Sequence, residues 1–124
     1  MTVIAEVQIE PDDLLYHRLS SQSHIKPDGS VASAAYKHNK LPDPEPSVDL
    51  ARLTTPEESI GRAGRAGFQL GELRVAVIWP LGFTIKHAPL ENNPSHSLIY
   101  GNTSMDTCAL LAENTRIIPG LAST

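Results

Sequence analysis

Apolar residues recur at every second position across residues 73–79, the most apolar run in the chain. This period of two, with valine and tryptophan among the apolar residues, is typical of a β-strand and predicts one over residues 72–79. Because the intervening positions include Ala76 and Ile78, both faces of the segment are apolar toward its end. We therefore expect a central strand that is covered on both faces and ends at Pro80.

Two shorter apolar runs follow, at residues 83–87 and 96–100, and the loop between them is rich in proline and asparagine. Such residues favour turns, so we interpret the two runs as a hairpin. A register symmetric about the loop pairs Phe83 with Tyr100, Ile85 with Leu98 and His87 with His96. Aromatic and aliphatic pairs across strands stabilise a sheet, and the sequence favours this register.

Weaker alternation predicts three further strands. Residues 2–9 alternate most regularly, residues 31–37 carry mostly small side chains, and residues 47–53 form a short run. Residues 14–19 are open to two interpretations, a short helical turn capped by an aspartate or a strand. The predicted strands thus lie near residues 2–9, 31–37, 47–53, 72–79, 83–87 and 96–100.

Two short helices are predicted from capping signals. Thr55 is a good N-cap residue, Pro56 suits the first helical position, and Glu58 completes a capping box. Glycines at every third position from residue 61 weaken this helix, which we expect to span about residues 56–64. A second helix, over about residues 105–113, should follow a serine or threonine cap.

These elements together predict an α+β fold. We expect a single small domain over residues 1–124, with a mainly antiparallel or mixed sheet and two short helices. Three prolines at alternate positions favour extended backbone within residues 38–46 and prevent regular pairing there. We therefore expect a mobile, proline-rich loop at residues 38–46.

Charge and cysteine content narrow the class of protein. The formal net charge of −4 argues against nucleic acid or an anionic membrane as the main partner. The single cysteine, Cys108, excludes an intrachain disulfide and fits a reducing compartment. No run approaches the ~20 apolar residues of a membrane span, so we expect a cytoplasmic protein.

The two histidines of the expected hairpin are the most specific candidates for catalysis. If His87 faces His96, the pair could act as base and acid or bind a metal, since histidine titrates near neutral pH. A metal site usually needs three or four ligands, and the only plausible additions, Glu91 and Asp106, have no diagnostic spacing. The simpler interpretation is two histidines hydrogen-bonded to loop backbone. We expect no metal and no cofactor.

A second candidate is a basic and aromatic cluster for binding. Tyr16, His17 and Arg18 are consecutive, and Lys37 ends the predicted strand at residues 31–37. If these segments pair, Arg18 and Lys37 could hold a phosphate or carboxylate group. The alternative is a solvated polar face with the tyrosine ring packed beside it.

The glycine-rich segment at residues 61–67 contains Arg62 and Arg65. It lacks the residue order of a phosphate-binding loop and follows a predicted helix instead of a strand. We interpret it as a helix-terminating loop whose two arginines could bind a partner.

The sequence contains no complete catalytic motif, and its proline-rich and glycine–arginine loops are suited to recognition. It therefore predicts a small interaction or accessory module that binds a protein partner or self-associates as a homo-oligomer. The alternative is a small histidine-dependent enzyme acting on a phosphate-bearing substrate such as RNA or a nucleotide. Its reactive groups would be His87 and His96, or His17 with Arg18. A metal-binding domain is a third possibility.

Overall fold

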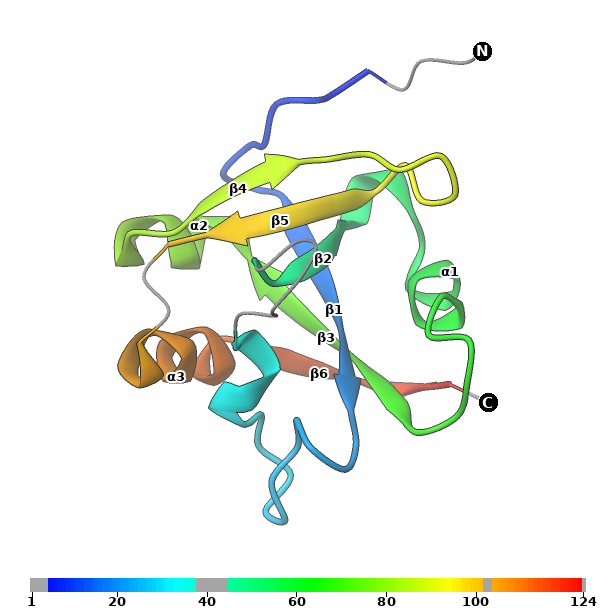
Figure 1. Ribbon diagram of the computed structural model, residues 1–124, viewed down its shortest axis with the longest axis vertical. Coiled ribbons are helices and arrows are strands. Elements are labelled where there is room, and N and C mark those ends of the chain that lie inside the picture. Colours follow the sequence, from blue (N-terminus) through cyan, green and yellow to red (C-terminus); the bar gives the residue numbers. More distant parts are fainter. Residues whose placement is uncertain (1–4, 38–44, 102–103, 124) are drawn as a thin grey trace.

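The computed structural model describes residues 5–37, 45–101 and 104–123, and six antiparallel strands in this part of the chain form one sheet (Figure 1). The strands are β1 (Leu14–Ser20), β2 (Ser47–Leu50), β3 (Phe68–Arg74), β4 (Thr84–His87), β5 (His96–Tyr100) and β6 (Arg116–Ala122). Their order is β4-β5-β2-β1-β3-β6. A single antiparallel sheet with a few short helices confirms the predicted α+β class.

Short helical segments connect and cover the strands. The α-helices are α1 (Pro56–Gly61), α2 (Val75–Ile78) and α3 (Met105–Glu113), and the 3-10 helices are η1 (Ser33–Tyr36), η2 (Ala51–Leu53) and η3 (Trp79–Leu81). In Figure 1, α3 and α1 lie on opposite sides of β1 and β3. We call the sheet face under α3 and η1 the first face, and the face under α1 the second face.

The two faces differ in how they are packed. The first face carries the larger hydrophobic core, to which β1, β2, β3 and β5 contribute buried side chains such as Leu19, Leu50 and Leu73. The second face has a much smaller cluster, in which Ile60 of α1 packs against Tyr16 and Leu70. Polar side chains therefore occupy a larger share of the second face.

Several predicted elements are confirmed. The bounds of α3 and β5 coincide with the predicted segments 105–113 and 96–100, and β4 begins one residue later than expected. Thr55 caps α1 as predicted, since its Oγ1 accepts a hydrogen bond of 3.1 Å from the backbone N–H of Glu58. The helix ends at Gly61, three residues short of the predicted end, because the glycines that follow favour turns.

The prediction of a central strand at residues 72–79 is wrong. β3 ends at Arg74, and the chain then turns into α2 and η3. Val75 and Ile78, three residues apart, are both fully buried. One helical turn therefore buries two apolar residues of the run whose alternation predicted a strand. β3 is also not central, because β2 and β1 occupy the middle of the sheet.

Three other segments also differ from their predictions. Residues 5–9 form no strand, and residues 1–4 lie outside the described part of the chain. Residues 31–37 form an isolated bridge at Val31 followed by η1, whose Ala35 and Tyr36 are buried toward α3. The predicted strand at 47–53 is divided into β2 and η2. The residues left open at 14–19 are strand, within β1.

The predicted hairpin exists, but its register is shifted by one residue. Thr84 pairs with Tyr100, Ile85 with Ile99, and His87 with Ser97. Because side chains alternate across a sheet, this shift places His87 on the first face and His96 on the second. The predicted pairing of the two histidines is therefore wrong. Most of the predicted mobile loop, residues 38–44, lies outside the described residues.

The sheet edge at β6 is irregular. The register between β3 and β6 shifts between Gln69 and Gly71, and β6 contains Pro119 followed by Gly120, whose φ is +78°. Proline has no N–H to donate, and a glycine with positive φ bends the strand. This edge is therefore poorly shaped for regular pairing with another strand.

Replacing Gly71 with alanine should destabilise the fold. A Cβ atom there would lie 2.6 Å from Cγ2 of Thr115 and 2.9 Å from Cδ1 of Leu19, so β3 or its neighbours would have to move. We expect Gly71→Ala to lower the free energy of unfolding by roughly 1–3 kcal/mol in urea denaturation. The matched control is Gly61→Ala, because no atom beyond its chain neighbours and the backbone of its own helix lies within 4 Å of the added Cβ. Equal unfolding midpoints for the two variants would contradict this expectation.

Candidate functional site

The second face contains a carboxylate that is completely buried. Asp49 lies in β2 between Val48 and Leu50, whose side chains join the core of the first face, so strand alternation directs Asp49 to the other side. Its side chain has 0% relative exposure. A buried charge is costly unless it is paired and hydrogen-bonded, so its partners define this region of the molecule.

Two arginines donate to the same oxygen of Asp49. Nη1 of Arg18, from β1, lies 2.7 Å from Oδ2, and Nη1 of Arg62, the C-cap residue of α1, lies 3.1 Å from it. Arg18 also donates to the backbone oxygen of Ser59, and Arg62 donates to Oγ1 of Thr54. The strand and the helix end are thereby fixed to one carboxylate.

Neutral groups complete the environment of Asp49. Oγ of Ser59 donates to Oδ2 at 2.7 Å, and Nδ2 of Asn93 donates to Oδ1 at 2.8 Å. Oδ1 of Asn93 in turn accepts a hydrogen bond of 2.6 Å from Oγ of Ser95. We call this set the Asp49 cluster; its members are Arg18, Asp49, Ser59, Arg62, Asn93 and Ser95.

The cluster keeps Asp49 ionised. Burial acts to raise the pKa of Asp49, but hydrogen bonds from Ser59, Asn93 and Arg18, with the positive charge of Arg18, outweigh it. The pKa of Asp49 therefore lies below its ordinary value. With one carboxylate between two guanidinium groups, the cluster carries one excess positive charge.

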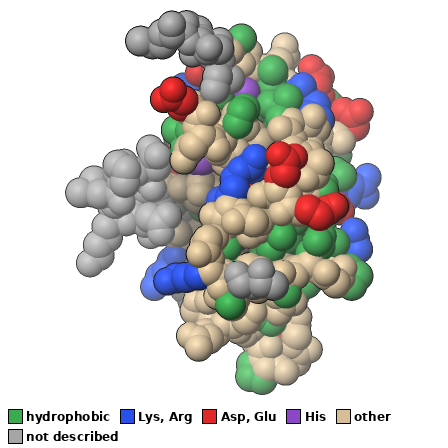
Figure 2. Space-filling model, turned by 90° about the vertical axis from the view of Figure 1, so that its right-hand side faces the viewer, with side chains coloured by type: hydrophobic (Ala, Val, Ile, Leu, Met, Phe, Trp, Pro, Cys, Tyr) green, Lys and Arg blue, Asp and Glu red, His purple; other side chains and the backbone are tan. Residues whose placement is uncertain are grey.

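The arginines of the cluster are only partly covered. The Arg18 and Arg62 side chains keep 23% and 22% of their surface exposed. Figure 2 views the molecule from the side on which α1 lies, and there positively and negatively charged side chains are intermingled.

The structure brings together two of the predicted binding residues, Arg18 and Arg62, and separates the others. Tyr16 shares the second face with Arg18, but His17 points to the first face, where its ring stacks on Tyr36 at 4.7 Å between centroids. Lys37 follows η1 on that first face, so the expected joint site of Arg18 and Lys37 is wrong.

Arg65 and the two histidines of the predicted pair do not share one site either. The guanidinium group of Arg65 lies 5.3 Å from the centre of the Phe68 ring, in the loop that follows α1. His87 accepts a hydrogen bond from the backbone N–H of Val7, and its Nε2 lies 2.6 Å from the backbone oxygen of Pro94. Both ring nitrogens of His87 therefore contact backbone, as the simpler interpretation of the sequence expected.

His96 keeps one ring nitrogen open. Its Nδ1 donates to the backbone oxygen of Ala88 at 2.8 Å, and its Nε2 makes no hydrogen bond with the described residues. No described side-chain nitrogen or oxygen is both buried and without a partner, so Nε2 reaches solvent. His96 pairs across strands with Asp49, so its imidazole ring lies next to the Asp49 cluster.

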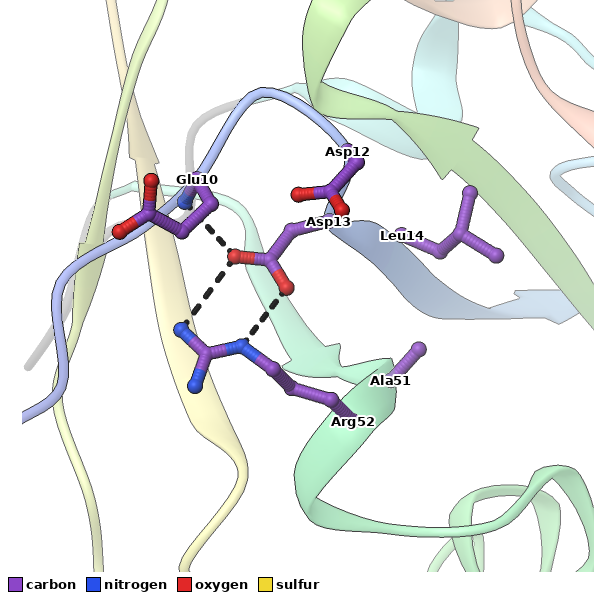
Figure 3. Close-up of a pocket in the computed structure, with 6 residues that line it drawn as sticks. All are labelled: Glu10, Asp12, Asp13, Leu14, Ala51 and Arg52. Atoms are coloured by element: carbon purple, nitrogen blue, oxygen red, sulfur yellow. Dashed lines mark hydrogen bonds and ion pairs between the residues drawn. The ribbon is translucent and has the colours of Figure 1, made fainter.

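A separate cavity of about 570 Å³ lies beside the start of β1 (Figure 3). Asp13 and Arg52 point toward each other in it, with Nε of Arg52 2.8 Å from Oδ1 of Asp13. The other Asp13 oxygen accepts a hydrogen bond from the backbone N–H of Glu10. Leu14 and Ala51 form its apolar part. The Asp13–Arg52 pair holds the N-terminal segment against η2.

The described residues contain no metal-binding group and no helix that could cross a membrane, and the protein matches no known protein with which it was compared. Among the described residues, no group of three or more His, Cys, Asp or Glu side chains is arranged to hold a metal ion. No helix in the described part of the chain has the length and apolar character needed to cross a membrane. Comparisons with known proteins found no matching family model, no matching curated protein and no matching solved structure.

Sequence reasoning missed four members of the cluster, Asp49, Ser59, Asn93 and Ser95. Asp49 carried a usable signal, because an acidic residue inside a predicted apolar strand requires a buried cationic partner. The serines and the asparagine carried none, because such residues are common in turns and at caps.

Neutralising the central carboxylate should strongly destabilise the protein. In Asp49→Asn, two guanidinium groups would face each other without a counter-charge, and we expect a loss of roughly 3 kcal/mol or more in the free energy of unfolding. Asp12→Asn is the matched control, because Asp12 is exposed and should change stability by less than about 0.5 kcal/mol. Similar denaturation curves for both variants would show that the cluster does not stabilise the fold.

The folded protein should lose stability in mild acid because of His17. Burial lowers the pKa of His17 from 6.5 to about 4, although hydrogen bonds to the carbonyl oxygens of Ala35 and Ser47 oppose this shift. Between these two pH values the unfolded chain binds more protons than the folded one, so stability falls as the pH drops from 6.5 to about 4. We expect a contribution of roughly 3 kcal/mol, measured as the change with pH in the difference between wild type and His17→Gln. Parallel curves for the two proteins would exclude this role.

Proposed function

We propose that this protein is a small interaction module that binds a protein partner through the surface around α1. The observation that carries the proposal is the Asp49 cluster, which fixes two partly exposed arginines on one buried carboxylate. Arginine is enriched among residues that dominate binding energy in protein interfaces. Side chains that are already ordered also lose less entropy on binding.

The surroundings of the cluster support the same proposal. Arg65 lies in the adjacent loop, and Glu57 is exposed on the same short helix. Opposite charges placed close together give an interface orientation and selectivity for its partner. At the β6 edge, the irregular register makes recognition by an added strand less suitable than recognition by these side chains.

Reversing a charge beside the cluster tests this proposal. Arg65→Glu changes the surface near α1 but does not touch the Asp49 cluster, so the fold should be preserved. We expect this variant to lose a partner that co-purifies with the wild-type protein from its own cells. If the partner is a second copy, light scattering on the purified protein should show an oligomer that the variant no longer forms.

The matched control is Glu113→Lys, a charge reversal at an exposed position of α3, on the other side of the sheet. It should retain the partner or the oligomer. A wild-type protein that is strictly monomeric, together with a set of co-purifying proteins unchanged by Arg65→Glu, would contradict the proposal.

A further inference from the structure

Arg18 and Arg62 use only part of their hydrogen-bonding capacity inside the protein. Every side-chain hydrogen bond that either arginine makes with the described residues comes from Nη1. Nε and Nη2 of both side chains have no partner among those residues. Because no described side-chain nitrogen is both buried and without a partner, these four nitrogens reach solvent.

The unused atoms form the edge of guanidinium that recognises oxyanions. Nε–H and one N–H of Nη2 point in parallel, at a spacing that matches the two oxygens of a carboxylate. Nη1 of each arginine is held by Asp49 at 2.7 or 3.1 Å, so both edges are positioned before a ligand arrives. Binding there would not require either long side chain to be ordered from a freely rotating state.

The charge of the cluster indicates which oxyanion it would accept. Arg18 and Arg62 together exceed Asp49 by one positive charge, which a single carboxylate would neutralise. A phosphoryl group carries about −1.5 to −2 at neutral pH and would leave an excess of negative charge.

We propose that Arg18 and Arg62 form a binding site for a carboxylate side chain from an acidic segment of a partner protein. The choice of a protein as the source of the carboxylate rests on the proposed function. The chemistry of the site rests on the unused guanidinium edges and the single excess charge.

An amidated and acetylated hexaglutamate peptide is a suitable probe, because its only charges are side-chain carboxylates. Added to isotope-labelled full-length protein, it should shift the Nε–H signals of Arg18 and Arg62 in nitrogen–proton correlation spectra. The Nε–H signal of Arg74, at the end of β3, should not move. Binding should weaken when salt is raised, as expected for a partly exposed ionic contact.

Arg62→Lys tests the guanidinium edge, because lysine retains the positive charge but has no fork of two N–H groups. We expect about tenfold weaker binding of hexaglutamate, the effect of losing one charge-assisted contact. Arg65→Lys is the matched control and should bind as the wild type does. Thermal unfolding of each variant would confirm that the comparison is made on folded protein.

Two results would overturn the inference, and both can be read from the wild-type protein alone. The first is an absence of Nε–H shifts at millimolar hexaglutamate. The second is a shift of these signals by inorganic phosphate at concentrations where hexaglutamate has no effect, which would assign the site to phosphoryl groups.

The outcomes also separate this inference from the proposed function. If hexaglutamate fails to bind but Arg65→Glu still abolishes a protein association, the carboxylate site is wrong and the interaction module remains. If hexaglutamate binds as described but no association depends on the α1 surface, the carboxylate site remains and the proposed function is wrong.

Discussion

A carboxylate without access to water has to be matched by charge and hydrogen bonds from its own protein, and Asp49 imposes this requirement on the second face of the sheet. Its partners come from β1, from α1 and from the loop before β5. The partner nearest to Asp49 in the sequence, Ser59, is 10 residues away. Removing any one partner would leave part of a buried charge uncompensated, which costs more than an ordinary surface contact is worth.

This requirement also explains why α1 exists as a helix. Six residues are too few to form a stable helix in water, because nucleation costs more than so few hydrogen bonds return. The capping residue Thr55 helps at its start, and Ile60 contributes a small apolar contact with the sheet. Ser59 and Arg62 add two contacts with Asp49. Ionic and hydrogen-bonding contacts therefore stabilise the second face of the sheet, as apolar packing stabilises the first face.

Three features could be predicted from the sequence because they depend on local patterns. They are the α+β fold class, the cap of α1, and the bounds of α3 and β5. The segment after Arg74 could not be predicted, since a short apolar run is equally compatible with a strand and with a helical turn. The hairpin register depends on the loop before β5, where residues such as Asn93 are engaged with Asp49 in another strand. The candidate residues Arg18 and Arg62 were visible, but their joint placement depends on tertiary structure.

Pro119 and Gly120, which has a positive φ, affect more than the shape of the sheet. An outermost strand that cannot offer a regular ladder is a poor template for stacking identical chains into fibrils. The β6 edge of the sheet therefore offers little template for such stacking. Straightening β6 would restore a regular row of N–H and C=O groups with which a strand of another chain could pair.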